Sequence, residues 1–390
     1  MKRTFCILLC LVSLLLTACA PQQDTQTTAA TTAATTAETT QTFPDLGGIK
    51  NIILIIGDGM GAAQIEAGQL ATGKTYCFES WNNTLVNTNC LNSKGEPVQT
   101  TDSAAAATAL ATGQRTVSQR VGLSMDGSIL KTILDYASED YGKATGVITT
   151  DSLCGATPAG FSAHTSSRYD EKGILNSQLV SNIDLLCGSS SDYTFSMRDK
   201  IKYAGYTLCD SLSYMESKMD EEKLYIQMSL GGADPLVELD DTVLLALDYL
   251  YKDPQGFVVM IEQAHVDKYC HNNELAGAQE CVNHLNDTVE AVMNWIGERT
   301  DTAVLITADH ETGGLSVSTE NIYPNTYITE TGENIYYQWT SEGHTPTEVR
   351  LFTYGFDPHF DRYYTDDLPS TILNTDVFNI MLDLLQNPVQ

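Results

Sequence analysis

Short, continuous runs of β-branched and aliphatic residues constrain the fold of this chain more than any other feature. Such runs are typical of strands that are buried on both faces of a sheet. They are Asn51–Ile56, Ala144–Ile148, Leu224–Met228, Phe257–Ile261 and Ala303–Ile306. Stretches of helical composition lie between them, at Ser103–Thr112, Ile129–Ser138, Thr242–Tyr251 and Glu280–Glu298. This alternation predicts a three-layer α/β/α sandwich around a mainly parallel sheet.

The first 42 residues differ in composition from the rest. Two basic residues, Lys2 and Arg3, precede the apolar run 5–16, which is too short to span a bilayer and suits a signal peptide. The run leads to Leu-Thr-Ala-Cys, ending at Cys19, which resembles a bacterial lipoprotein signal. We therefore predict a signal peptide at 1–18 and a protein that is exported and anchored to the membrane through a lipid at Cys19, at the cell surface or on the periplasmic face. The alternative is ordinary secretion with a chance cysteine.

Residues 19–42 are rich in threonine, alanine and glutamine and contain almost no bulky apolar side chain. Such a segment buries too little surface to offset the entropy of ordering it, so it is predicted to be a flexible tether. Beyond it we find no internal repeat and no second linker. Residues 43–390 are therefore predicted to form one catalytic domain with loop insertions.

Charge and cysteine content limit the classes of partner and site. The chain has 21 Lys+Arg against 50 Asp+Glu, a formal net charge of −29. This charge argues against nucleic acid as a binding partner, because phosphate backbones need basic side chains. A phosphate-type ligand would need local cations, such as metal ions or a placed arginine. Seven cysteines follow Cys19, so at least one stays free, and the absence of a CxxC pair argues against a cysteine-based zinc site.

Polar side chains follow the predicted strands at the points where ligands bind in α/β sheets. Asp58 lies in a glycine-rich turn directly after the first run, and Glu262 ends the fourth. Asp267 and His271 follow at a spacing of four, which allows a carboxylate and an imidazole to share one metal. Each of these groups alone could equally form a salt bridge or a helix cap. Their recurrence at strand ends favours a metal site.

The remaining candidate ligands complete a mixed set. Asp309 and His310 follow the last run, and His344 lies in a Glu-Gly-His-Thr segment. Nitrogen and oxygen ligands together suit zinc, while an all-oxygen group of Asp58, Thr157 and Glu262 suits magnesium.

Ser103 is a candidate nucleophile. It is predicted to begin an alanine-rich helix, where unpaired backbone N–H groups and the helix dipole favour anionic groups. The segment lacks the GxSxG elbow of serine hydrolases. From this segment alone, an ordinary helix cap is the favoured interpretation.

Six segments together resemble the metal-dependent alkaline phosphatase family. They are IILIIGDGMG, TDSAAAATALATG, ATPAGFSAHTSSR, MIEQAHVDKYCH, ITADHETGG and EGHTP, and they occur in the family's order between Asn51 and His344. The resemblance implies a phosphate monoester hydrolase that uses two Zn²⁺ ions and one Mg²⁺ ion, acts through a phosphoserine intermediate and releases inorganic phosphate.

The resemblance also implies a role for each site residue. Ser103 would be the nucleophile, Arg168 would clamp the phosphate, and Lys268 would help to hold it through water. The implied metal ligands are Asp58, Asp309 and His310 for one zinc, Asp267, His271 and His344 for the other, and Asp58, Thr157 and Glu262 for magnesium.

Two features set this chain apart from the family pattern. Gly155 stands where members commonly carry Asp or His near the magnesium, so the third metal is expected to bind more weakly or to be replaced. The interval between His310 and His344 leaves room only for a small crown-type insertion. A homodimer is compatible with the resemblance, and the natural ester is not specified by it.

Three other functions compete with phosphate monoester hydrolysis. A sulfatase should carry a Cys/Ser-x-Pro-x-Arg motif, which does not occur around Ser103 or any cysteine. A phosphodiesterase fits Arg168 less well, because a second ester group would displace one clamped oxygen. A non-catalytic metal- or phosphate-binding protein would have no need to keep Ser103 with a full ligand set.

Overall fold

The computed structural model describes residues 48–232, 235–329 and 331–387, and we consider only the unit Phe43–Gln390. The predictions of a signal peptide at 1–18, a lipid at Cys19 and a tether at 19–42 lie outside the described residues. Among the described helices, none combines the length and apolar character that crossing a bilayer requires.

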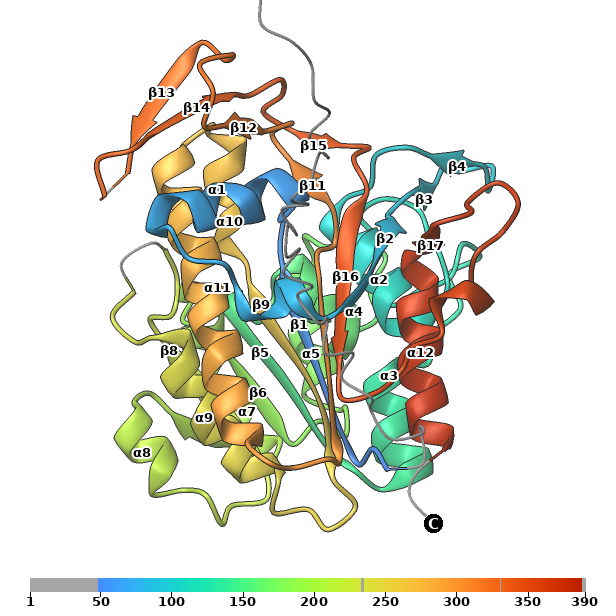
Figure 1. Cartoon of the computed structure of the whole chain (residues 1–390). Coiled ribbons are helices and arrows are strands. Elements are labelled where there is room, and N and C mark those ends of the chain that lie inside the picture. The colour runs from blue at the N-terminus through green and yellow to red at the C-terminus, as the bar shows by residue number, and fades with distance from the viewer. Residues whose placement is uncertain (1–47, 233–234, 330, 388–390) are drawn as a thin grey trace, which may run out of the picture. The chain divides into compact units, whose positions relative to one another are not determined.

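A ten-stranded sheet forms the centre of this unit (Figure 1). Its order is β17 (Thr371–Leu373), β2 (Asn82–Asn87), β16 (Val349–Tyr354), β10 (Thr302–Thr307), β1 (Asn51–Gly57), β9 (Phe257–Gln263), β5 (Ala144–Ser152), β6 (Leu185–Ser189), β8 (Leu224–Met228) and β7 (Thr207–Cys209). All neighbours pair in parallel except that β16 runs antiparallel to β10 and β2. The mainly parallel sheet is therefore confirmed, and the five predicted strands are β1, β5, β8, β9 and β10.

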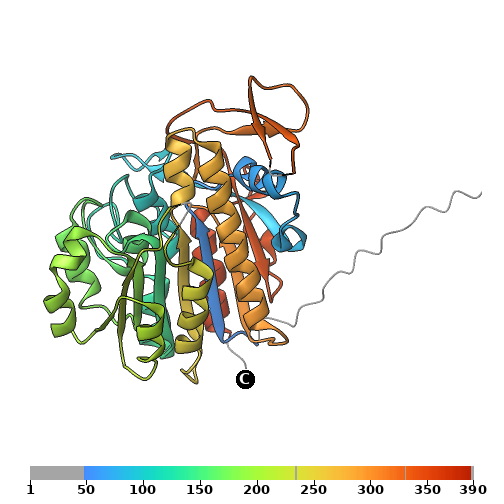
Figure 2. The same ribbon diagram turned by 90° about the vertical axis from the view of Figure 1, so that its left-hand side faces the viewer.

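Helices cover both faces of the sheet (Figures 1 and 2). One layer contains α1 (Ala62–Thr72), α9 (Leu239–Leu250), α10 (His265–His271) and α11 (Leu275–Ile296). The other contains α2 (Ser103–Thr112), α3 (Ile133–Asp135), α4 (Ala156–Ser162), α5 (Glu171–Gln178) and α12 (Asn374–Gln386). Three shorter helices lie in the chain around β7: α6 (Asp192–Ser196), α7 (Arg198–Tyr203) and α8 (Leu212–Glu216). The predicted three-layer architecture is confirmed.

Two kinds of element departed from the sequence prediction. The helix predicted at Ile129–Ser138 is only the single turn α3 followed by a wide π-type turn at Tyr136–Asp140. The strands β7 and β17 were missed because they have three residues each, and β2 and β16 were missed because polar residues interrupt their apolar ones. β6 was missed because its Leu-Leu-Cys-Gly-Ser sequence carries no β-branched residue, although its first four residues are buried.

Helix α2 is buried at every position. Its alanines let α4 pack closely against it: a Cβ atom placed on Gly160 would lie only 2.6 Å from the Cβ of Ala107. At its first position α2 presents Ser103 to the carboxyl edge of the sheet, and Gly113 ends the helix in the left-handed conformation.

The interval between His310 and His344 forms a small antiparallel sheet. It contains β12 (Ser316–Ser318), β14 (Asn334–Gln338) and β13 (Asn325–Ile328), and it lies over α1 and α10 (Figure 1). Two short pairs accompany it: β11 (Glu311–Thr312) with β15 (His344–Thr345), and β3 (Cys90–Leu91) with β4 (Pro97–Val98). The insertion is therefore small, as predicted.

The seven cysteines of the described residues are all free thiols, and only Cys77 is exposed.

Candidate active site

The strand register brings the predicted polar residues to one level at the carboxyl edge of the sheet. Glu262 on β9 lies opposite Ile56 on β1 and opposite Thr149 on β5, while Gly57 pairs with Gln263. Asp58 therefore leaves β1 beside the end of β9. Asp309 and His310 follow the last residue of β10, which neighbours β1 on its other side.

Ser103 stands at the N-terminus of α2, where the sequence analysis placed it. Asp102 caps the helix, since its side chain accepts a hydrogen bond of 3.2 Å from the Ala105 N–H. The Ser103 hydroxyl is buried and lies 3.3 Å from Nε2 of His310. The candidate nucleophile thus faces the predicted metal ligands directly.

Arg168 reaches the same helix terminus from the loop between α4 and α5. The Arg168 guanidinium lies 3.3 Å from the Asp102 carboxylate. The backbone N–H of Arg168 donates to the carbonyl of Gln119 at 2.8 Å. Both carboxylate oxygens of Asp102 also accept from the Gln119 N–H at 3.0 Å. Asp102 therefore connects the serine helix to the arginine.

Two overlapping groups of carboxylates and imidazoles have their ligand atoms within 4.8 Å of one another. One comprises Asp267, His271 and His344, and the other Asp58, Asp267 and His310. Asp267 belongs to both, so the two groups are contiguous. We call these five residues the Asp267 cluster. Asp309 adjoins it, with its carboxylate 3.1 Å from Nε2 of His310.

Backbone carbonyls orient two histidines of the cluster. Nδ1 of His344 donates to the carbonyl of Thr101 at 2.8 Å, and Nδ1 of His271 donates to the carbonyl of Glu342. A carbonyl oxygen can only accept, so Nδ1 carries a proton in both histidines, and Nε2 is the nitrogen that faces the cluster. Nε2 of His344 and of His271 lie 3.5 and 3.3 Å from the Asp267 carboxylate.

The carboxylates at the site differ in the direction in which their pKa is shifted. Burial disfavours the charged form of Asp267, but hydrogen bonds from His271 and Thr312 and the charge of His310 hold its pKa below the ordinary value. Asp58 has no comparable donors. Burial and the charges of Asp309, Asp267 and Glu262 raise its pKa well above the ordinary value. Asp58 is thus a buried carboxylate whose charged form is disfavoured, with Nε2 of His310 3.7 Å away.

The side-chain oxygens of Thr157 and Glu262 lie together near Asp58, and we call this group the Glu262 pocket. Glu262 accepts a hydrogen bond from the Thr149 hydroxyl, and its pKa is raised to about 8, mainly by burial. Lys268 extends from α10 toward this side of the site, where its ammonium lies 2.9 Å from the Asp151 carboxylate.

The residues present fit the metal ions that the sequence analysis expected. Oδ1 of Asp58, Oδ2 of Asp309 and Oγ1 of Thr157 are buried and accept no hydrogen bond. Buried oxygens without partners are costly, so their convergence indicates a place for cations. The imidazoles and carboxylates of the Asp267 cluster suit zinc, and the oxygens of the Glu262 pocket suit magnesium.

Three residues that support the site were not singled out from the sequence. Asp102 and Thr312 are described above. Glu311 is buried, and its carboxylate accepts from Gln64 at 2.8 Å, from the N–H groups of residues 314 and 315, and from Thr345. It thereby joins the His310 loop to β15, which carries His344. Asp102 directly precedes Ser103, and Glu311 and Thr312 directly follow His310. This adjacency in the sequence was the signal that could have identified them.

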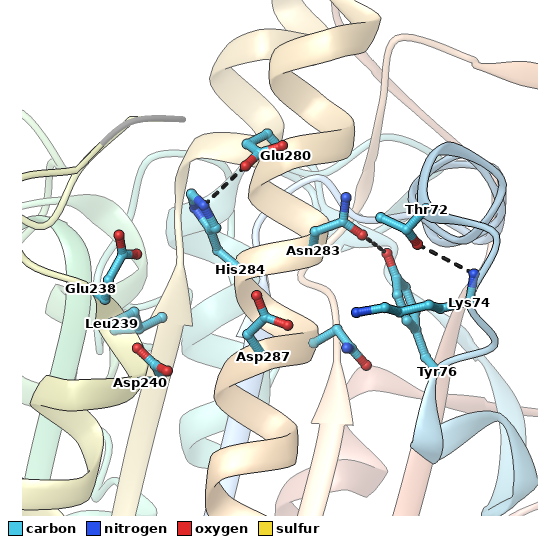
Figure 3. Close-up of a pocket in the computed structure, with 11 residues that line it drawn as sticks. Thr72, Lys74, Tyr76, Glu238, Leu239, Asp240, Glu280, Asn283, His284 and Asp287 are labelled. Atoms are coloured by element: carbon cyan, nitrogen blue, oxygen red, sulfur yellow. Dashed lines mark hydrogen bonds and ion pairs between the residues drawn. The ribbon is translucent and has the colours of Figure 1, made fainter. Parts of the chain in front are cut away.

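A separate cavity of about 330 Å³ lies away from these residues, beside α11 (Figure 3). Four acidic side chains are part of its lining, and Nε2 of His284 lies 3.4 Å from the Glu280 carboxylate. Tyr76 donates a hydrogen bond to Asn283 across it (Figure 3). None of the predicted site residues lines this cavity.

Comparisons with known proteins agree with the geometry. The sequence model of a family described as alkaline phosphatase matches residues 49–202 and 221–340, more than half of the chain. The chain is 32% identical to Alkaline phosphatase 3 of Bacillus subtilis (strain 168) over 70% of its length and 64% of that protein, so the match spans less than two thirds of this relative. It is 26% identical to alkaline phosphatase of Escherichia coli (strain K12), covering 80% of this chain and 81% of that one.

Solved structures support the fold. Alkaline phosphatase from the Antarctic bacterium TAB5 superposes with a TM-score of 0.74 at 24% identity, covering 88% of this chain and 99% of that chain. A variant of that enzyme with magnesium bound in its M3 site gives a TM-score of 0.73 over the same shares. His344 lies beyond the matched range 221–340, so its place in the site rests on the geometry described above.

Proposed function

Because the chain belongs to the alkaline phosphatase family, we propose that it is a metal-dependent phosphomonoesterase that releases inorganic phosphate from small phosphate monoesters. One observation carries the proposal. The Ser103 hydroxyl begins a helix and faces His310 of the Asp267 cluster at 3.3 Å, with Arg168 at the same helix terminus. A candidate nucleophile, a group of candidate metal ligands and an arginine that can bind an anion therefore lie side by side.

Ser103 performs the nucleophilic step. Its oxygen attacks phosphorus as the hydroxyl proton is lost, the bond from phosphorus to the ester oxygen breaks, and the leaving oxygen departs as an alcohol after taking up a proton. Water then attacks the phosphoserine, which frees phosphate and restores the hydroxyl. The N-terminus of α2 favours the negative charge that gathers on the serine side of the phosphoryl group.

Arg168 and Lys268 bind and orient the phosphoryl group. The planar guanidinium offers two parallel N–H donors to two phosphoryl oxygens, a geometry that lysine cannot reproduce. Asp102 and Gln119 hold the arginine at the start of α2. Lys268 adds a positive charge at the Asp151 side of the site and contacts phosphate through water.

We propose that the Asp267 cluster, with Asp309, holds two zinc ions and that Asp58, Thr157 and Glu262 hold one magnesium ion. Asp58, Asp309 and His310 would hold the first zinc, and Asp267, His271 and His344 the second. The magnesium in the M3 site of the TAB5 variant supports a third cation in this fold. Bound divalent cations lower the pKa of the serine hydroxyl and neutralise charge on the entering and leaving oxygens.

The proposal is tested by the hydrolysis of an aryl phosphate monoester beside the matching diester and sulfate. The full chain is assayed with metals and after chelation, and zinc and magnesium are counted on the same sample. We expect zinc-dependent turnover of the monoester well above that of the other esters. A preference for the diester or the sulfate would replace the proposed reaction, and bound zinc without turnover of any ester would indicate a binding protein.

Ser103→Ala tests the nucleophile. It should abolish the phosphoserine, detected by trapping with labelled substrate, while the zinc content stays near that of the wild type. Equal turnover by mutant and wild type would remove Ser103 from this role. Thr288→Ala, which deletes a buried hydroxyl on α11 far from the site, is the matched control.

We further propose that the protein is exported and attached to the membrane through a lipid at Cys19, and that it forms a homodimer. The sequence at Cys19 supports the first point, and family membership is compatible with the second. Labelling with a radioactive fatty acid should mark the wild type and not Cys19→Ala. Sedimentation of the protein without its first 42 residues decides the oligomeric state.

A further inference from the structure

Strand β5 is irregular at its carboxyl end. Ile148 pairs with Cys187 and Ser152 pairs with Ser189, so four residue steps on β5 face two on β6. The extra length takes residues 149–151 out of register with β6. Thr149 keeps its regular pairing with Glu262 of β9 and donates to it, while the carboxylate of Asp151 lies at Lys268.

Gly155 leaves a space that Asp151 occupies. The backbone of Gly155, with φ of −59° and ψ of 160°, is accessible to any residue. Yet a Cβ atom placed on it would lie 3.3 Å from Oδ2 of Asp151 and 2.9 Å from the carbonyl oxygen of Ser152. The carboxylate of Asp151 therefore stands against the position from which a side chain at 155 would extend.

The neighbours of Asp151 place it at the edge of the Glu262 pocket. Its Oδ1 forms an ion pair of 2.9 Å with Lys268, and its charge adds to burial in raising the pKa of Glu262. Thr157, whose hydroxyl has no partner, follows Gly155 by two residues. Lys268 also lies 3.5 Å from Nε2 of His265, whose pKa is lowered to about 4 by burial and by the lysine, so the histidine is neutral at pH 7. Asp151 is therefore the acidic side chain that contacts the lysine.

We propose that Asp151 replaces the missing side chain at Gly155, completing the Glu262 pocket with a carboxylate and fixing Lys268 toward the phosphate. The proposal rests on the proposed function, because it assigns a residue to the third cation and to phosphate binding. Asp151 acts in two directions. Its negative charge favours a divalent cation near Asp58, Thr157 and Glu262, and its ion pair restricts the lysine to the site side of α10.

Opposite shifts in magnesium affinity distinguish this role from a structural one. Asp151→Asn keeps the shape and removes the negative charge, so magnesium should bind more weakly, by about tenfold. Lys268→Met removes the positive charge that neutralises Asp151, so magnesium should bind more tightly. Both variants should bind phosphate more weakly, since one frees the ammonium and the other deletes it. A merely structural defect would weaken magnesium binding in both.

The experiment uses the zinc-loaded full chain and calorimetric titration with Mg²⁺ and, separately, with inorganic phosphate. Zinc content and circular dichroism are recorded for every variant. Asp220→Asn is the matched control, because Asp220 is an exposed acid paired with Lys252 at 3.0 Å, and it should leave both affinities unchanged. Wild-type affinity for magnesium and phosphate in Asp151→Asn would overturn the proposal, as would weaker magnesium binding in Lys268→Met.

These titrations do not depend on catalysis. If the wild type binds both ions but hydrolyses no ester, the proposed function fails while the role of Asp151 is still decided. If the wild type hydrolyses monoesters and Asp151→Asn binds magnesium normally, only the role of Asp151 fails.

Discussion

The Asp267 cluster and the Glu262 pocket lie at the same edge of one sheet, but the protein holds them differently. In the Asp267 cluster, further contacts fix three of the ligands: Thr312 on Asp267 and backbone carbonyls on His271 and His344. In the Glu262 pocket, the Thr157 hydroxyl has no hydrogen-bond partner, and Glu262, which accepts from Thr149, is buried with a raised pKa.

This difference indicates how each group depends on its cation. Ligands that are oriented before binding require little reorganisation when a metal arrives. Buried oxygens with few donors instead gain most of their stabilisation from the cation itself. We therefore expect the Asp267 cluster to keep its geometry without metal, and the Glu262 pocket to change its protonation and stability when metal is removed.

The largest effect is expected from a change at Asp267, because this residue belongs to both three-residue groups. Asp267→Asn keeps the hydrogen bond from Thr312 but removes the negative charge that both groups share. We expect kcat/KM for a monoester to fall on the order of a thousandfold, with loss of bound zinc. Zinc counting and steady-state kinetics check this, with Asp210→Asn as a control at an exposed ion pair. A variant with full zinc content and activity would contradict the assignment.

In the protein whose metals have been removed by a chelator, the free energy of unfolding should decrease as the pH rises from about 4.5 to about 8. Folded Glu262 has a pKa of about 8 against the ordinary 4.5. Within this window the unfolded chain has released the Glu262 proton while the folded chain keeps it, so rising pH favours the unfolded state. The free energy of unfolding should fall by a few kcal/mol, as an order of magnitude.

Urea unfolding at pH 5, 6.5 and 8, with chelator or with metals, measures this loss. Bound cations should remove most of the decrease, and Glu262→Gln should flatten it in the chelated protein. A chelated wild type that is as stable at pH 8 as at pH 5 would show that Glu262 does not behave as described.

Glu311→Gln tests how far the Asp267 cluster depends on its support. The glutamine amide would place N–H donors among the donors from Gln64 and residues 314 and 315, which loosens the link between His310 and His344. We expect zinc affinity to fall about 10- to 30-fold. Competition with a coloured chelator measures it. Glu290→Gln, at a glutamate that accepts one hydrogen bond from Asn286, should bind zinc normally.

Thr157→Val should have the smallest effect and the most selective one. It keeps the shape of the side chain and removes the unpartnered Oγ1. Magnesium affinity should fall several-fold, to at most about tenfold, while zinc content is unchanged. Calorimetric titration beside Thr288→Val checks this. Loss of zinc in Thr157→Val would mean that the two groups are not independent.

The sequence was most informative where burial and chemistry coincide. Continuous apolar runs predicted β1, β9 and β10, and the polar residues at their ends did converge. Asp58, Asp309 and His310 could be found because each follows a strand that is buried on both faces. A charged residue at such a position is unusual unless it binds a ligand.

Residues that act through their neighbours could not be found in this way. The pairing of Asp151 with Lys268 depends on two extra residues in β5, and a register shift leaves no mark on the local sequence. Glu311 is one more acidic residue until the fold places Gln64 and Thr345 around it. Strands near the sheet edge, such as β2, were missed because a half-exposed strand keeps few apolar residues.

The close contact of α2 with α4 has a consequence for how this protein can be altered. Ala107 leaves no room for a larger side chain against Gly160, and every residue of α2 is buried. A library randomised at Ala104–Ala107 and selected for turnover should return small residues there, although none of them is assigned to the ester. Attempts to reshape the active site should therefore leave the alanines behind the serine untouched.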